Sequence, residues 1–104
     1  MILTNTETLP GKTINQCLGV VSGSTVRAKH FGRDFLSGLK NIVGGELQAY
    51  TELLGESRDQ ATQRMIDQAT QLGADAVVNV RFSTSSIAAG ASEIYVYGTA
   101  VTLD

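Results

Sequence analysis

The sequence is poor in the residues that bind metals, close disulfides or interrupt strands: its 104 residues include one cysteine, one histidine and one proline. A single cysteine, Cys17, cannot form an intramolecular disulfide, which is typical of a reducing compartment. Structural zinc sites take close-spaced pairs of ligands, and no such spacing occurs in the chain. One histidine, His30, also leaves little room for a Ser-His-Asp triad. The sequence therefore predicts neither a disulfide framework nor a metal site built within one chain.

Charge is scarce as well, because 17% of the residues are Asp, Glu, Lys or Arg, against about 25% in a typical globular domain. Eight Lys and Arg stand against ten Asp and Glu, for a formal net charge of -2. Without a basic excess, no nucleic-acid partner is expected. The apolar runs are far shorter than the ~20 residues that span a bilayer, and no signal peptide follows Met1. We therefore expect a cytoplasmic protein that engages neither nucleic acid nor membrane.

The length predicts one domain over residues 1–104, since a domain usually spans roughly 100–200 residues. Folding a chain of this size buries roughly two thirds of its surface, which supports one core without disulfides or a metal. Hydrophobic residues make up 42% of the chain. The low charge leaves more weakly polar surface than one copy usually exposes to water.

The first half of the chain predicts two strands and a helix. Pro10-Gly11 marks a turn after a short N-terminal strand. Residues 13–27 predict strand structure that Ser22-Gly23-Ser24 interrupts, either as a hairpin loop or as a bulge in one long strand. The flanking segments are short for two strands, which favours the bulge. Apolar residues at three- and four-residue intervals then predict a helix over 31–43, and Gly44-Gly45 ends it.

The second half predicts a longer helix over 47–72 and a hairpin of strands over 75–85 and 93–103, joined by a small, polar loop. The helix carries one apolar stripe: Leu47, Tyr50, Leu54, Ala61, Met65, Ala69 and Leu72. Both faces of the last strand are apolar, which indicates burial on both sides. Two helices can cover only one face of the sheet, so we expect the other face to meet another subunit.

The order strand, strand, helix, helix, strand, strand predicts an α+β domain with an antiparallel or mixed sheet and both helices on one side. The chain also resembles the YbjQ-like family of small bacterial and archaeal proteins, some of them labelled "putative heavy-metal-binding". The matching segments span nearly the whole chain: Gly19-Val20-Val21-Ser22-Gly23, Phe31-Gly32-Arg33-Asp34-Phe35, Ile42-Val43-Gly44-Gly45 with Tyr50, Ser57-Arg58-Asp59, Leu72-Gly73-Ala74-Asp75-Ala76-Val77-Val78 and Tyr97-Gly98-Thr99-Ala100-Val101.

This resemblance implies a dodecin-subunit-like sheet with two helices packed on one face, and a homopentameric ring with a barrel-like arrangement of strands. One segment departs from the family pattern. Arg27-Ala28-Lys29-His30 stands where the family usually has Gly-Ala-Asn before its first helix. Any site that the family shares at this position is therefore in doubt here.

Cys17 and His30 are the candidate metal ligands. Copies of Cys17 gathered around a symmetry axis would form a thiolate ring for a soft divalent or monovalent metal ion. The commoner alternative is a buried cysteine that acts as a small hydrophobe. His30 is either a proton switch or an ordinary surface histidine.

Three further groups have both a functional and a structural interpretation. Arg27, Lys29 and Arg33 with helix amides would make an anion site, or Arg33 pairs across a subunit boundary. The carboxylates on one face of the long helix would hold a divalent cation or act as acid and base, or they form a solvated face: Glu52, Glu56 and Asp59. The tyrosines would stack on a flat ligand, or they pack in the core or an interface: Tyr50, Tyr95 and Tyr97.

These observations favour a non-enzymatic, oligomeric binding or scaffold protein whose ligand lies at the axis or between subunits. A soft heavy-metal ion at Cys17 is the named candidate ligand. The alternative is a flavin-type small-molecule binder or an enzyme with a composite site between subunits. That alternative rests on fold analogy alone.

Overall fold

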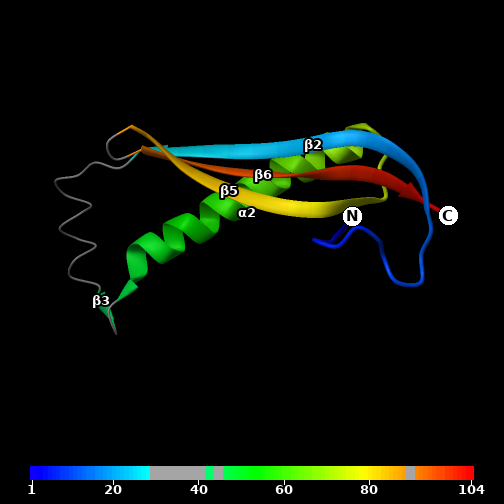
Figure 1. Ribbon diagram of the computed structural model, residues 1–104. Helices are drawn as coiled ribbons and strands as arrows, with labels where there is room; N and C mark the ends of the chain where they lie inside the picture. The colour runs from blue at the N-terminus through cyan, green and yellow to red at the C-terminus, as the bar shows by residue number, and fades with distance from the viewer. Residues whose placement is uncertain (29–41, 44–45, 89–90) are drawn as a thin grey trace.

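The computed structural model describes residues 1–28, 42–43, 46–88 and 91–104. Its main feature is a four-stranded sheet with one long helix across one face (Figure 1). The strands are β1 (Ile2–Leu3), β2 (Ile14–Ala28), β5 (Ala76–Ala88) and β6 (Ala91–Leu103), in the order β1-β5-β6-β2. A short ladder of β3 (Ile42–Val43) and β4 (Glu46–Leu47) precedes the helix α2 (Gln48–Gln71).

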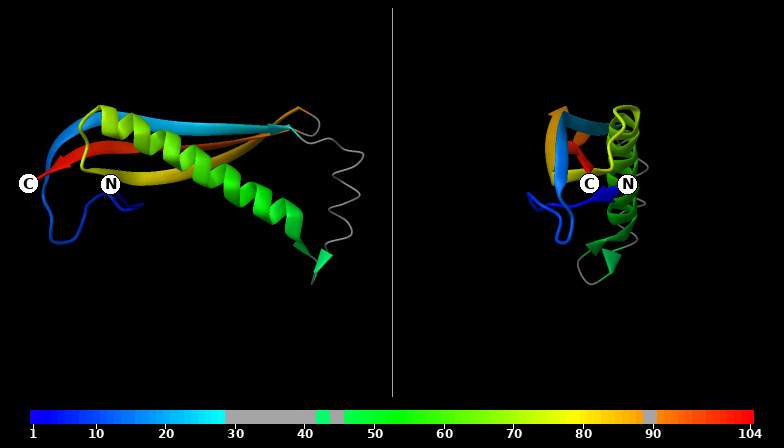
Figure 2. Two further views of the ribbon diagram at one scale, coloured as in Figure 1. Left: turned by 180° about the vertical axis from the view of Figure 1, so that it is seen from behind. Right: turned by 90° about the vertical axis from the view of Figure 1, so that its right-hand side faces the viewer.

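The sheet is mixed, because β6 pairs antiparallel with both β2 and β5, while β1 pairs parallel with β5. The predicted α+β class is therefore confirmed. Figure 2 shows α2 on one side of the sheet only, crossing the strands diagonally. The helix predicted over 47–72 is also confirmed. Residues 31–41 of the other predicted helix lie outside the described residues, and its last two, Ile42 and Val43, lie in a strand instead.

The strand predicted over 13–27 is confirmed as β2, but the predicted position of its bulge is wrong. The irregularities of pairing lie between Ile14 and Gln16 and between Cys17 and Gly19. Gly19 has φ +114°, which a side chain would disfavour. From Val20 to Ala28 the pairing with β6 is continuous. Gly23 lies in this continuous stretch, where it faces the backbone of α2.

The β5–β6 hairpin is confirmed, and its strands are longer than predicted. The small, polar stretch that predicts a loop takes part in the ladder, because Ser86 pairs with Ser92 and Ala88 with Ala91. The hydrogen bonds of the ladder come from backbone groups. A partner strand can therefore keep residues of low strand propensity in an extended conformation. A further irregularity occurs at Asn79, which has φ +55° and lies in a shift of register between Val78 and Arg81.

Apolar side chains gather on both faces of the sheet. On the face that α2 covers, Ala61, Met65 and Ala69 of the helix are fully buried with strand residues of the same cluster: Val21, Val77, Ile94, Val96 and Ala100. Neighbouring strand residues point to opposite faces. Ala76, Val78 and Val101 accordingly form a second cluster on the other face, against which Leu9, Ile14 and Leu103 pack.

The backbone of the helix lies directly against β2 at Gly23. A Cβ atom at this position would overlap the carbonyl oxygen of Ala61 and lie 2.7 Å from the amide nitrogen of Met65. Both atoms belong to the helix backbone, which cannot rotate away as a side chain can. The absence of a side chain at Gly23 therefore sets how near the helix and the sheet come.

Two helix side chains also cover the free edge of β2, which is the last strand in the sheet order. The backbone amide of Ser22 donates to Oε1 of Gln68 at 2.7 Å, and Nη1 of Arg64 donates to the carbonyl of Ser24 at 2.6 Å. Unpaired backbone groups on an edge strand invite pairing with another chain. Gln68 and Arg64 occupy two of these groups from within the same chain.

We expect Gly23→Ala to lower the free energy of unfolding by about 1–3 kcal/mol or more, because the added methyl group overpacks a rigid contact. Gly55→Ala is the matched control in the helix. A Cβ atom at Gly55 meets nothing within 4 Å, so this change should raise stability by about 0.5–1 kcal/mol. Urea unfolding of both variants measures the difference. Equal effects of the two substitutions would contradict the close contact at Gly23.

Candidate functional site

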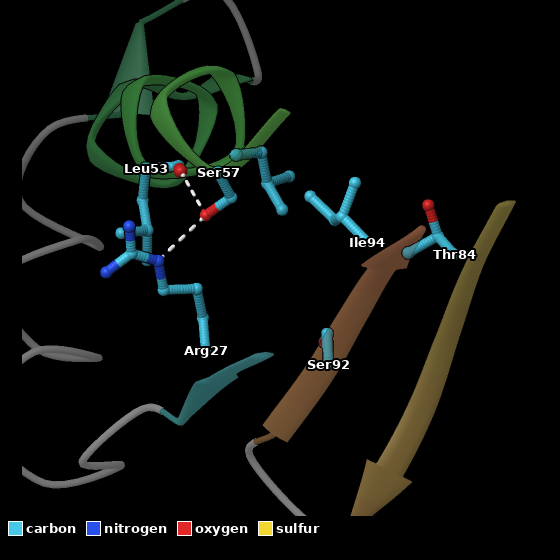
Figure 3. A pocket seen from close by; sticks show the side chains of 7 residues that line it. Arg27, Leu53, Ser57, Thr84, Ser92 and Ile94 are labelled. Carbon is cyan, nitrogen blue, oxygen red and sulfur yellow. Dashed lines mark hydrogen bonds between the residues drawn. The ribbon is translucent and has the colours of Figure 1, made fainter. Parts of the chain in front are cut away.

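A cavity of about 240 Å³ lies between the first half of α2 and the sheet (Figure 3). Residues of four elements line it: Leu53, Leu54 and Ser57 of α2, Arg27 of β2, Thr84 of β5, and Ser92 and Ile94 of β6. The strand residues reach the same cavity because Arg27 pairs with Ser92, and Thr84 pairs with Ile94. Paired residues of neighbouring strands lie on the same face of a sheet.

Ser57 connects the helix to β2 at one wall of this cavity. Its hydroxyl accepts a hydrogen bond from Nε of Arg27 at 3.1 Å and donates to the carbonyl of Leu53 at 2.8 Å. Its backbone carbonyl accepts from Oγ1 of Thr25 at 3.0 Å. Ser57 and Thr25 are both buried. These bonds hold the half-buried Arg27 beneath the helix, as Figure 3 shows.

Arg27 has only neutral partners among the described residues. Besides Ser57, its guanidinium donates from Nη2 to Oε1 of Gln60 at 2.8 Å. No ion pair joins it to a carboxylate within the described part of the chain. Among the described residues, the cavity therefore combines a cationic group without an acidic partner, the hydroxyls of Ser92 and Thr84, and apolar side chains.

Sequence reasoning named Arg27 as one member of an anion site, and the structure brings it to a cavity. The other two members, Lys29 and Arg33, lie outside the described residues. Sequence reasoning missed Ser57, although a signal was present. Ser57 continues the four-residue spacing of Ala61, Met65 and Ala69, so a polar residue occupies a core position of the helix. Leu54 and Leu72, placed in the apolar stripe, are 40% and 48% exposed.

The thiol of Cys17 is exposed on β2, where its backbone pairs with Val101. In one chain it is therefore not the buried hydrophobe of the alternative interpretation. His30 lies outside the described residues. Within the described ranges, no group of three or more His, Cys, Asp or Glu side chains could hold a metal ion. One chain, as far as it is described, does not supply the donor set that a heavy-metal site needs.

The other candidate groups have ordinary surroundings. Glu52, Glu56 and Asp59 are exposed on α2, as a solvated face requires. Tyr95 and Tyr97 stack on each other, with ring centroids 5.5 Å apart and an angle of 27° between the planes. The described helix is not long and apolar enough to cross a membrane.

The sheet face opposite α2 is open over part of its area. Val20 and Val26 of β2 are 73% and 55% exposed. They alternate with Val21 and Thr25, which are buried beneath the helix, so they point away from it. Tyr97 of β6, whose backbone pairs with Ser22 between them, is also exposed. We call Val20, Val26 and Tyr97 the outer patch.

We expect Ser57→Ala to lower the free energy of unfolding by about 1 kcal/mol, since Nε of Arg27 loses its acceptor under the helix. Thr70→Ala is the control, because Thr70 makes the same kind of bond to a carbonyl four residues earlier but is exposed. Its effect should stay within about 0.5 kcal/mol. Chemical denaturation distinguishes the two. A neutral Ser57→Ala would show that this hydroxyl does not join the helix to β2.

Comparison with known proteins gives consistent matches over the whole chain. The YbjQ family, described as "Putative heavy-metal-binding", matches residues 1–104. A UPF0145 protein of Hahella chejuensis is 61% identical over 104 residues and covers 100% of both chains. Another, from Archaeoglobus fulgidus, is 60% identical over 103 residues, which cover 99% of this chain and 95% of the relative.

A solved structure shows the same fold. It is a protein of unknown function of the DUF74 family from Pediococcus pentosaceus, with a TM-score of 0.68 and 18% identity. The match covers 100% of this chain and 98% of the other. Together, the full-length family match and the relatives confirm the resemblance seen in the sequence: the chain belongs to the YbjQ-like family.

Proposed function

We propose that this protein is a non-enzymatic binding or scaffold protein that acts as a homo-oligomer. The observation that carries the proposal is the outer patch. The helix covers one face of the sheet, and Leu9 packs over one end of the other face. Val20, Val26 and Tyr97 remain exposed beyond that end. A second copy of the chain would remove these side chains from water.

Composition supports the same assembly. Lys, Arg, Asp and Glu make up 17% of the chain, so little charge opposes contact between copies. Family resemblance sets the proposed number of subunits at five, in a dodecin-like, barrel-like ring. In a closed five-subunit ring the contacts are head-to-tail. Each copy therefore presents one surface to one neighbour and a different surface to the other.

The proposed ligand at the ring axis is a soft metal ion bound by thiolates of Cys17 from several subunits. Cys17 is exposed and lies on β2, the same strand that carries Val20 and Val26. Thiolates select soft ions. Because the described part of one chain supplies no donor set of its own, this site depends on the assembly.

A small-molecule binder is the second candidate function, and the cavity beside Arg27 favours it. The cavity holds a cationic group, hydroxyls and apolar side chains, which are the elements of a ligand site. This candidate does not require a catalytic group. It is compatible with the same oligomer.

We expect native mass spectrometry of the untagged protein to give a five-subunit mass, and Val20→Lys to shift it to smaller species. The substitution places a charge where the outer patch would be buried, which costs free energy unless the charge is paired. Gln71→Lys is the control, because Gln71 is exposed on the helix. It should leave the five-subunit mass unchanged. A wild-type protein that stays monomeric would overturn the proposed assembly.

We expect Cys17→Ser to abolish binding of Cd²⁺, used here as a soft probe ion, while the oligomer persists. A hydroxyl replaces the thiolate and is a poor ligand for a soft ion. Metal content after dialysis, measured by mass spectrometry of the intact oligomer, checks this. Ser22→Ala, also on β2, is the control and should bind as the wild type does. Unchanged Cd²⁺ content in Cys17→Ser would remove the metal proposal and leave the assembly intact.

A further inference from the structure

We propose that the cavity between α2 and the sheet binds a small organic carboxylate, with the carboxylate on Arg27 and the apolar part against Leu53, Leu54 and Ile94. This inference rests on the second candidate function, the small-molecule binder, and names its ligand class. The lining residues all come from one chain, so the inference does not depend on the subunit number or on Cys17.

Arg27 carries a positive charge that no carboxylate of the described residues balances. A guanidinium carries more N–H donors than the two hydrogen bonds to Ser57 and Gln60 use. Arg27 is half-buried, and no described carboxylate pairs with it. Removing a cation from water is costly unless an anion or further acceptors meet it. A bound anion at this wall of the cavity would supply both the opposite charge and the additional hydrogen-bond acceptors.

Geometry favours a planar anion. The bond from Nε to Ser57 fixes the guanidinium on one side, beneath the helix (Figure 3). A fixed guanidinium offers parallel donors that match the two oxygens of a carboxylate. Ser57 is itself held by its bond to the carbonyl of Leu53. The cation is therefore oriented before any ligand arrives.

The rest of the cavity favours an apolar tail. Leu53, Leu54 and Ile94 line it, together with the small residues Ser92 and Thr84. A phosphate carries more charge and seeks several donors at once, whereas Arg27 is the one cationic residue among the described residues of this lining. At about 240 Å³, the cavity is smaller than those that hold drug-sized ligands, which start at roughly 300 Å³. A short aliphatic acid fits both its chemistry and its size.

The test is calorimetric titration of the full chain with hexanoate, with hexanamide as the uncharged probe of the same shape. We expect hexanoate to bind at least tenfold more tightly than hexanamide. Arg27→Gln should weaken hexanoate binding roughly 10- to 100-fold, as the loss of a charged hydrogen bond predicts. Arg58→Gln is the matched control, because Arg58 is exposed on α2 and is not among the residues that line the cavity. It should bind as the wild type does.

A second variant keeps the test decisive if Arg27→Gln does not fold. Ser92→Leu fills the cavity from β6 and removes none of the hydrogen bonds that hold Arg27. It should abolish hexanoate binding while circular dichroism shows a folded chain. Three results would overturn the inference: no hexanoate binding to the wild type, equal affinity for hexanamide, or unchanged binding in the folded Ser92→Leu chain. Binding of inorganic phosphate in place of hexanoate would overturn the carboxylate assignment.

These outcomes are separate from those of the proposed function. The titration reports on one chain's cavity, whereas native mass spectrometry reports on the outer patch. A monomer that binds hexanoate would retain this inference and reject the assembly. A pentamer that binds neither hexanoate nor hexanamide would support the assembly and reject this inference.

Discussion

The contact between Gly23 and the backbone of α2 determines how the helix and the sheet fit together. At this point the helix lies directly on β2, with Ala61 and Met65 against the glycine. The helix crosses the strands diagonally (Figure 2), so its first half lies away from the contact. There, a hydrogen bond from the long side chain of Arg27 to the hydroxyl of Ser57 connects the two layers. The cavity between them follows from a close contact at one point and a diagonal crossing.

The two faces of the sheet are covered by different parts of the chain. One helix is described, and it buries the face that carries Val21, Val96 and Ala100. The N-terminal segment, through Leu9, covers one end of the opposite face. The exposed Val20 and Val26 lie beyond its reach. The chain itself therefore covers one face of the sheet and part of the other. We propose that self-assembly covers the part that remains exposed.

The sequence predicts elements better than it predicts the contacts between them. The spacing of Ala61, Met65 and Ala69 was sufficient for the long helix, and β-branched residues for β2. The wider extent of the hairpin was not predictable from the residues themselves, because backbone pairing holds residues 85–88 and 91–92 whatever their side chains. The positive φ of Asn79 accompanies a shift of register between β5 and β6, and the local sequence pattern contains no information on that register. Arg27 was recognised as a cation near a site, but the role of Ser57 depends on where the helix crosses β2.

The occupied edge of β2 has a consequence for solubility at high concentration. A continuous ladder of chains, the route by which sheets grow into fibrils, needs an open edge on each side of every copy. Gln68 and Arg64 hold the amide of Ser22 and the carbonyl of Ser24 in the middle of this edge. A chain that added there would have to displace both side chains from the helix that anchors them. Growth of an endless ribbon is thus interrupted at β2 by two residues of the helix.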